Sequence, residues 1–283
     1  MLPEQTLPAK QVKGGRSTPW LDKARSLQQH IRQHHFNLVI GLECEFYFLD
    51  TLTDAECEKL VADYNQTAEL PIVKEDGARQ FECHTSSSNQ VYEVIRQYER
   101  LRETLHTLAG GQVTFTAMPH SDQPRSGMHV HIHAEDANGK RLFYKHDSKM
   151  SDALYHCLAG LMANLEEASA LLCAHPNAPR QDHVASTVSW GSNNRSTAIR
   201  LPESEPDKKR IEYRIATSDT PIEPLLAMIL ASILDGLERH PELPPAIYGN
   251  ASDAQYELQK LPQNKAEAEA VLARKFRLRQ LLV

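Results

Sequence analysis

The segment GLECEFYFLD, residues 41–50, alternates polar and apolar side chains with the two-residue period of a β-strand. Glu43, Glu45 and Tyr47 then lie on one face, opposite an apolar face. That apolar face carries Leu42, Cys44, Phe46 and Phe48. Two neighbouring carboxylates on such a strand are unfavourable unless positive charge lies between or above them. A divalent cation would supply that charge, and an exposed edge strand would avoid the problem, so both interpretations stay open here.

Three histidines alternate with apolar residues in the segment SGMHVHIHAED. As a strand, this segment places His129, His131 and His133 on one face. Such a face can hold a metal ion, contact a nucleotide, or only cover a sheet with polar groups. Several histidines together are typical of zinc, but the surplus of carboxylates elsewhere in the chain favours a harder ion, Mg²⁺ or Mn²⁺.

A second acidic pair occurs in KEDGARQFECHTS. Glu75 and Glu82 flank a predicted turn at Asp76–Gly77, and Glu82 faces away from its apolar neighbours in the following strand. Because a glutamate on a half-exposed strand is common, this pair alone does not distinguish a site from a solvated surface.

A strand of mixed charge is predicted in KKRIEYRIA, where Arg210, Glu212 and Arg214 share one face. One interpretation is a surface ladder of salt bridges, which contributes little. Just upstream, NNRSTAIRLP adds Arg195 and Arg200. Arginines gathered around one glutamate also provide a clamp for phosphate oxygens, which is the second interpretation.

Hydrophobic periodicity predicts long helices that alternate with mostly antiparallel strands, which is typical of the α+β class. Residues 1–19 are predicted to form a flexible arm, and residues 20–283 one domain. The predicted helices cover 21–34, 53–69, 89–108, 150–174, 224–238 and 264–279. The predicted strands cover 38–49, 78–86, 113–117, 128–133, 184–190, 196–201 and 210–215.

The composition excludes several kinds of partner. The chain has 31 Lys and Arg against 37 Asp and Glu, a formal charge of −6, which argues against nucleic acid. No apolar run approaches membrane-spanning length and the N-terminus lacks the apolar core of a signal peptide, so no membrane partner is expected. The five cysteines have no CxxC spacing, which indicates reduced thiols in a cytoplasmic protein.

The motifs follow one another in a specific order. ExE on a strand is followed by ExxxxxxE with Gln two positions before its second Glu, then by SGMHxH, NRSxxIR and RIExR. In this order they resemble the glutamine synthetase family, from about Gly41 to Leu261. The resemblance implies a curved, mostly antiparallel sheet that lines a metal and nucleotide funnel and is backed by helices. Residues 20–283 are therefore expected to form a glutamine synthetase-like catalytic domain.

The resemblance also implies the cofactors and their ligands. The family uses ATP and holds two or three divalent ions, Mg²⁺ or Mn²⁺. By motif matching, the ligands of one ion resemble Glu45, Glu75 and Glu82, and those of a second resemble Glu43, His129 and Glu212.

Among the basic residues, Arg195 resembles the arginine that stabilises phosphoryl transfer. Arg214 resembles the residue that contacts the transferred phosphate or the acidic substrate. The resemblance implies nucleotide contacts for Arg200, Arg210 and His131.

Two loops depart from the family pattern on the substrate side. The loop that usually reads NGSGMH is PRSGMH here, so Pro124 and Arg125 stand where Asn and Gly help to receive glutamate. The family's EAP segment aligns with residues 183–185, and Arg180 is expected to replace a loop arginine that holds the substrate carboxylate. The predicted substrate contacts are therefore Arg125, Arg180 and Arg214.

Only about forty residues precede Glu43. The family's N-terminal β-grasp domain, which completes the site of a neighbouring subunit, is therefore expected to be missing. A homo-oligomer and a separate subunit that carries such a domain are the two partner arrangements that this leaves open.

The residues for phosphoryl transfer are kept, whereas those around the acid and the amine differ. We therefore predict an ATP-dependent ligase that activates a glutamate-like carboxylate as an acyl phosphate and couples it to a small-molecule amine larger than ammonia. Because the chain has no GxxxxGK[ST] loop, side chains and metals are expected to hold the phosphates. Three alternatives stay open: the catalytic half of a two-polypeptide ligase, an ordinary glutamine synthetase, and a non-catalytic binding or scaffold protein.

Overall fold

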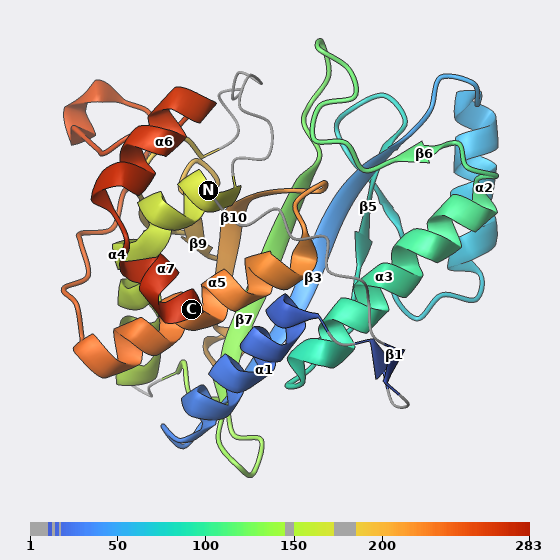
Figure 1. Cartoon of the computed structure of the whole chain (residues 1–283). Helices are drawn as coiled ribbons and strands as arrows, with labels where there is room; N and C mark the ends of the chain where they lie inside the picture. The colour runs from blue at the N-terminus through green and yellow to red at the C-terminus, as the bar shows by residue number, and fades with distance from the viewer. Residues whose placement is uncertain (1–10, 13–14, 17, 145–149, 173–184) are drawn as a thin grey trace.

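The computed structural model describes residues 11–12, 15–16, 18–144, 150–172 and 185–283 (Figure 1). A short hairpin pairs β1 (Gln11–Val12) with β2 (Gly15–Arg16), within the predicted N-terminal arm. Most other residues of that arm lie outside the described residues.

One sheet of eight strands organises the rest of the fold. Its strands are β3 (Asn37–Phe48), β4 (Val73–Lys74), β5 (Gln80–His84), β6 (Val113–Thr114), β7 (Gly127–Glu135), β8 (Trp190–Ser192), β9 (Ile199–Leu201) and β10 (Ile211–Thr217). The strand order is β4-β5-β3-β7-β10-β9-β8, with β6 paired to β3. Every pair is antiparallel except β8 with β9. The predicted α+β class with a mostly antiparallel sheet is confirmed.

The helices follow the predicted order with small changes at their ends. They are α1 (Pro19–Arg32), α2 (Asp54–Asn65), α3 (Val91–Leu108), α4 (Asp152–Leu172), α5 (Ile222–Arg239), α6 (Lys265–Arg274) and α7 (Arg277–Leu282). Helix α1 begins after Thr18, whose hydroxyl accepts the N–H of Leu21 at 3.1 Å, and Pro19 fits its first turn. No helix among the described segments combines the length and the apolar character needed to cross a membrane.

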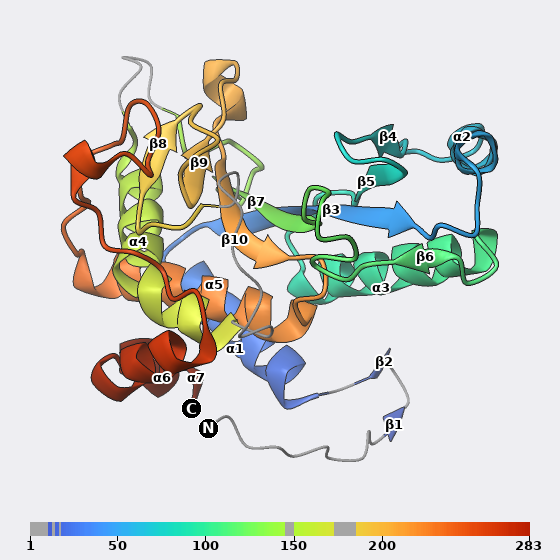
Figure 2. The same ribbon diagram turned by 90° about the horizontal axis from the view of Figure 1, so that it is seen from above.

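The two faces of the sheet have different surroundings. On the apolar face, Phe46, Met128 and Ile132 are each 0% exposed, and α1, α3 and α5 lie beneath them (Figure 2). The strands at the two edges of the sheet, β4 and β5 at one end and β8 and β9 at the other, lie on the opposite side of the central strands from these helices (Figure 2). The charged side chains of the central strands line a cavity on that side of the sheet.

Helices α4 and α5 approach each other at two glycines. A Cβ atom added to Gly160 would lie 2.2 Å from the carbonyl oxygen of Ser232, and one added to Gly236 would lie 2.1 Å from that of His156. Any larger residue would force the two backbones apart, so glycine is required here for close packing.

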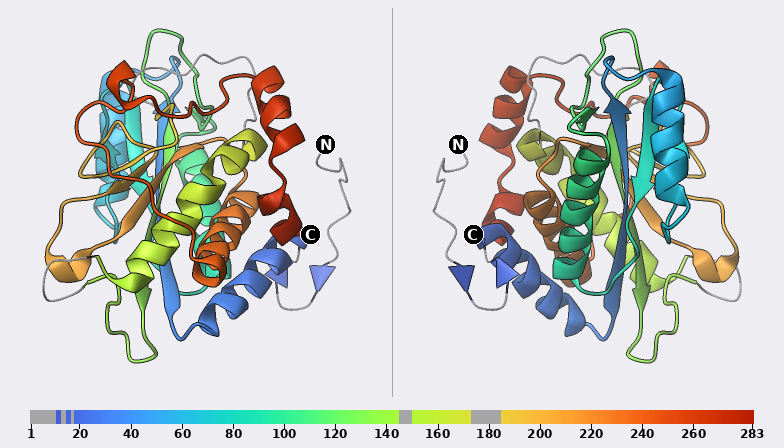
Figure 3. Two further views of the ribbon diagram at one scale, coloured as in Figure 1. Left: turned by 90° about the vertical axis from the view of Figure 1, so that its left-hand side faces the viewer. Right: turned by 90° about the vertical axis from the view of Figure 1, so that its right-hand side faces the viewer.

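The C-terminal helices are attached through buried carboxylates, which we call the C-terminal ion cluster. It comprises Glu166, Glu167 and Asp235 with Arg239, Arg274, Arg277 and Arg279. Helices α6 and α7 lie along α4 and α5 (Figure 3, left). Asp235 is 0% exposed and accepts hydrogen bonds from Arg277 at 2.6 Å and from Asn164 at 2.9 Å.

Two predicted elements are wrong. The helix predicted over 264–279 breaks at Lys275, which is extended, because Glu167 accepts the backbone N–H groups of Leu278 and Arg279 and so starts a new helix. The strand predicted over 184–190 starts only at Trp190. Residue 184 lies outside the described residues, and Ser186 and Val188 bond to the chain near Leu261.

Candidate active site

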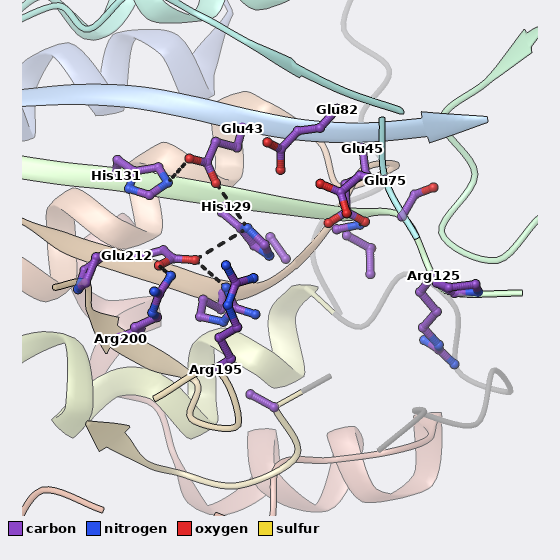
Figure 4. Close-up of a pocket in the computed structure, with 18 of the residues that line it drawn as sticks. Glu43, Glu45, Glu75, Glu82, Arg125, His129, His131, Arg195, Arg200 and Glu212 are labelled. Carbon is purple, nitrogen blue, oxygen red and sulfur yellow. Dashed lines mark hydrogen bonds and ion pairs between the residues drawn. The ribbon is translucent and has the colours of Figure 1, made fainter. Parts of the chain in front are cut away.

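The polar face of the sheet lines a cavity of about 980 Å³. Carboxylates from β3 and β5 lie on one side of it, and arginines from the β9–β10 region on the other (Figure 4). Every predicted site residue that the structure describes lines this cavity, namely Glu43, Glu45, Glu75, Glu82, Arg125, His129, His131, Arg195, Arg200, Arg210, Glu212 and Arg214. The remaining one, Arg180, lies outside the described residues.

Glu45 and Glu82 lie opposite each other where β3 pairs with β5. Burial raises the pKa of Glu45, although the N–H of Gly127, 2.8 Å from its carboxylate, and the charge of His129 oppose the rise. Burial also raises the pKa of Glu75, and the charges of Glu82 and Glu45 add to it. These carboxylates are therefore more costly to ionise than in water, because burial and their mutual repulsion outweigh the neighbouring groups that favour the charged form.

Glu43, His129 and Glu212 come from three adjacent strands, β3, β7 and β10. The Nδ1 atom of His129 is 3.5 Å from Glu43 Oε2 and 3.6 Å from Glu212 Oε1. Burial acts to raise the pKa of Glu43, but hydrogen bonds and charge from His129 and His131 outweigh burial and bring the pKa below its ordinary value. Burial also acts to raise the pKa of Glu212, but nearby positive charges, first that of Arg214, outweigh burial and lower the pKa.

Three groups among the described residues bring ligand atoms within 4.8 Å of one another: Glu43–His129–Glu212, Glu45–Glu82–His129 and Glu43–Glu82–His84. The first is the set predicted for the second ion. The second contains two of the three residues predicted for the first ion, while Glu75 lies close enough for their charges to raise its pKa. Carboxylates with few imidazoles suit Mg²⁺ or Mn²⁺, so these residues fit the ions that the sequence resemblance implies.

Glu212 is shared by two arginines on the basic side of the cavity. Arg200 Nη1 donates a hydrogen bond of 2.9 Å to Glu212 Oε2, and Arg214 pairs with Glu212 Oε1. The Nε atoms of both arginines are buried and have no hydrogen-bond partner in the described part of the chain. Arg195 is exposed at the same cavity. This side therefore offers guanidinium donors to an anion.

His131 is held between the two sides. Arg210 Nε lies 3.0 Å from His131 Nδ1, and because a guanidinium can only donate, Nδ1 accepts. The proton of a neutral imidazole is then on Nε2, which is 2.8 Å from Glu43 Oε1. His131 thus connects an arginine of the basic side with a carboxylate of the acidic side.

The Pro124–Arg125 segment is fixed to the sheet through its carbonyl groups. Tyr47 donates to the carbonyl of Pro124 at 2.8 Å, and Gln80 donates to that of Arg125 at 3.0 Å. The Nε and Nη2 atoms of Arg125 are buried without a hydrogen-bond partner among described residues. Burial lowers the pKa of Arg125, and the charge of Asp219 opposes this. Arg125 therefore brings a positive charge with spare donors to the cavity.

Two further histidines lie on polar strand faces. His133 does not line the cavity; it is buried and pairs with Glu135 at 2.9 Å, which agrees with the third possibility, a polar group that only covers the sheet. His84 was missed, although the alternation Glu82–Cys83–His84 already put it on the same face as Glu82. Its Nε2 atom is 2.9 Å from Glu82 Oε1, and this hydrogen bond raises the pKa of His84.

The family whose description is "glutamine synthetase, catalytic domain" matches residues 70–282. Gamma-glutamylputrescine synthetase PuuA from Escherichia coli (strain K12) is 28% identical over 265 residues, which cover 79% of this chain and 56% of that protein. A glutamine synthetase from Thermococcus kodakarensis is 30% identical over 154 residues, 52% of this chain and 34% of that protein.

The first of these comparisons shows that the chain spans a little over half the length of that relative. Among solved structures, one titled "GmaS/ADP complex-Conformation 1" superposes with a TM-score of 0.80 at 20% identity, covering 95% of this chain and 72% of that one. The motif order, the match of the catalytic domain and the common fold agree: the chain belongs to the glutamine synthetase family.

Proposed function

We propose that this protein is an ATP-dependent carboxylate–amine ligase. It activates a glutamate-like carboxylate as an acyl phosphate and couples it to a small-molecule amine larger than ammonia. The observation that carries the proposal is the division of one cavity into a carboxylate side and a guanidinium side that meet at Glu212.

The chemistry of amide formation explains why such a cavity is needed. A carboxylate cannot lose oxide, so one of its oxygens is first phosphorylated, and the amine then displaces phosphate. Phosphoryl transfer between anions requires positive charge on the phosphate oxygens as negative charge moves between them. Divalent cations, when bound, supply part of that charge.

The carboxylate side would hold these cations. We assign Glu45, Glu75 and Glu82 to one ion and Glu43, His129 and Glu212 to another, either Mg²⁺ or Mn²⁺. The support is that burial and mutual repulsion raise the pKa of Glu45 and Glu75, which a bound cation would relieve.

The guanidinium side would bind ATP and the developing charge. We assign the nucleotide phosphates to Arg200, Arg210 and His131, and the transferred phosphoryl group to Arg195 and Arg214. The support is that all five residues line the same cavity and that the Nε atoms of Arg200 and Arg214 have no hydrogen-bond partner among the described residues. For the acid substrate we assign Arg125 and Arg214, together with Arg180.

An amine larger than ammonia is favoured over ammonia by two observations. The relative that matches 79% of this chain, at 28% identity, is named for putrescine, an amine larger than ammonia. The Pro124–Arg125 segment also replaces residues that the family uses around glutamate, so the substrate side of the site departs from that of ordinary glutamine synthesis. Ordinary glutamine synthesis is the second candidate.

The proposal is tested by measuring ADP release with Mg²⁺, ATP and a panel of acids and amines that includes ammonia. We expect release only when a glutamate-like acid is present, with amide formed from an amine and not from ammonia. Amide formed best from ammonia would favour the second candidate. Absence of ADP release with every acid would contradict catalysis, and absence of Mg·ATP binding by calorimetry would favour a scaffold.

We further propose that the protein acts in the cytoplasm and in an assembly, either with further copies of itself or with a separate subunit. The support for the compartment is that Cys44, Cys57, Cys83 and Cys157 are buried free thiols. Light scattering on the purified protein, and co-purification from its host, would identify the assembly.

A further inference from the structure

We propose that His84 is a metal ligand: with Glu43 and Glu82 it forms a cation position on the β5 side of the cavity that favours Mn²⁺ over Mg²⁺. This position is additional to the ligand sets predicted from the sequence. It concerns metal binding alone and does not depend on which reaction the protein catalyses.

The sheet register brings these side chains together. Glu43 in β3 pairs with His84 in β5 on one side and with His129 in β7 on the other. A row across three strands therefore reads imidazole, carboxylate, imidazole on the polar face. Glu82 lies two residues before His84 in β5 and so shares that face.

The distances within the group suit a coordination sphere. His84 Nε2 is 2.9 Å from Glu82 Oε1 and 3.9 Å from Glu43 Oε1, and the three ligand atoms lie within 4.8 Å of one another. With metal–ligand bonds of about 2.1 Å in an octahedron, neighbouring ligands are about 3.0 Å apart and opposite ligands about 4.2 Å apart. The observed separations lie close to this range, so one ion can reach all three atoms with small side-chain adjustments.

The nature of the donors determines which ion is favoured. Mg²⁺ binds through carboxylates and retained waters, whereas imidazole nitrogen shifts affinity toward transition metals. The set predicted from the sequence contains one histidine, His129, and His84 adds a second nitrogen donor. Its side chain is 28% exposed, so an ion can reach it from solvent.

An ion pair between an imidazolium and two carboxylates is the competing explanation, because His84 also lies within salt-bridge distance of both glutamates. The two explanations differ in one measurable respect. A ligand transmits nitrogen coupling to bound Mn²⁺, whereas an ion-pair partner does not.

The test uses Mn²⁺ alone, added to the whole chain without nucleotide. We expect His84→Gln, whose amide can still donate to Glu82, to weaken the nitrogen coupling seen by pulsed electron paramagnetic resonance. The same variant should lower the ratio of Mn²⁺ to Mg²⁺ affinity by at least about tenfold. The matched control His133→Gln, a histidine that pairs with Glu135 and belongs to none of the three ligand groups, should change neither quantity. Unchanged coupling and an unchanged affinity ratio in His84→Gln would overturn the proposal.

A second measurement needs no variant, so it applies even if His84→Gln does not fold. Chemical modification of histidines in the wild-type protein can be mapped by mass spectrometry with and without Mn²⁺. We expect Mn²⁺ to protect His84 and to leave the exposed His30 unaffected. Equal modification of His84 in both conditions would also overturn the proposal.

Discussion

The cavity and the C-terminal ion cluster are built from the same kinds of residue, but they balance their charges differently. In the C-terminal ion cluster, arginines neutralise each buried carboxylate; burial acts to raise the pKa of Asp235, yet Arg239, Asn164 and Arg277 bring it down to about 2. In the cavity, Glu45 and Glu75 have raised pKa values and no arginine pairs with them in the described residues. Burial of a carboxylate therefore does not indicate a site, whereas burial without compensation does.

Of the substitutions that test this comparison, Glu212→Gln is expected to have the largest effect on activity. It removes the negative charge of the side chain and keeps its shape. Glu212 pairs with Arg200 and Arg214 and belongs to a predicted metal set. We expect ADP release to fall by at least about a hundredfold, because a predicted ligand of the second cation is lost, and with it the positive charge that this cation would supply to the phosphoryl group. Steady-state kinetics measure this. Turnover equal to that of the wild type would mean that the cavity is not the active site.

Addition of Mn²⁺ should stabilise the fold, and more so at high pH. The pKa values of Glu45 and Glu75 are raised, so their carboxyl groups bind protons more tightly in the folded state than in the unfolded state. The stability that this gives is present below the ordinary carboxyl pKa and is lost as the pH rises through the raised pKa values. Cations replace those protons, and at a concentration a hundredfold above Kd they add about 2.7 kcal/mol. Thermal unfolding with EDTA or MnCl₂ at about pH 5 and about pH 8 measures the difference. Equal stabilisation at both pH values would contradict the assignment.

Asp235→Asn should have the opposite profile, with lost stability and intact metal binding. Its partners Arg239 and Arg277 are about half exposed, so water can replace part of the hydrogen bonding that they lose. We expect the free energy of unfolding to fall by about 2 kcal/mol. Because the pKa of Asp235 falls from 3.8 to about 2 on folding, its contribution is present above pH 3.8 and is lost as pH falls toward 2. Urea denaturation measures the cost. The exposed Glu238→Gln on the same helix is the control and should cost almost nothing.

The smallest expected effect concerns Arg125, a half-buried cation in the cavity. Its Nε and Nη2 atoms have no hydrogen-bond partner among the described residues, unlike the paired arginines of the C-terminal ion cluster. We expect Arg125→Gly to change the relative kcat/KM for glutamate and for an acid with an additional carboxylate by about tenfold in favour of glutamate, since one charge-assisted contact is lost. If acid preference stayed the same, Arg125 would not contact the substrate.

Much of the site could be predicted because alternation along a strand decides which face each side chain occupies. The two-residue period alone put Glu43, His129 and Glu212 on polar faces. It could not predict that Glu45 lies opposite Glu82, because pairing between distant segments depends on the whole fold. His84 obeyed the same alternation and was missed because only its neighbour Glu82 matched a family motif.

Errors in the predicted elements have similar causes. The helix predicted over 264–279 has a continuous helical pattern, and its break depends on Glu167, more than a hundred residues earlier in the chain. The segment before Trp190 has the composition of a strand, but Val188 donates its N–H to the carbonyl of Gln259 in a distant loop. Local sequence contains no information about either partner.

The position of Glu212 between Arg200, Arg214 and His129 has a thermodynamic consequence. While its carboxylate binds the two arginines, their donors are partly occupied and are less available to an anion. Any cation that draws Glu212 toward itself frees those donors and so strengthens anion binding, and any anion that captures the arginines frees Glu212 for a cation. By linkage, the factor of enhancement is the same in both directions. Cation and anion affinities in this cavity are therefore expected to be positively cooperative through one shared carboxylate.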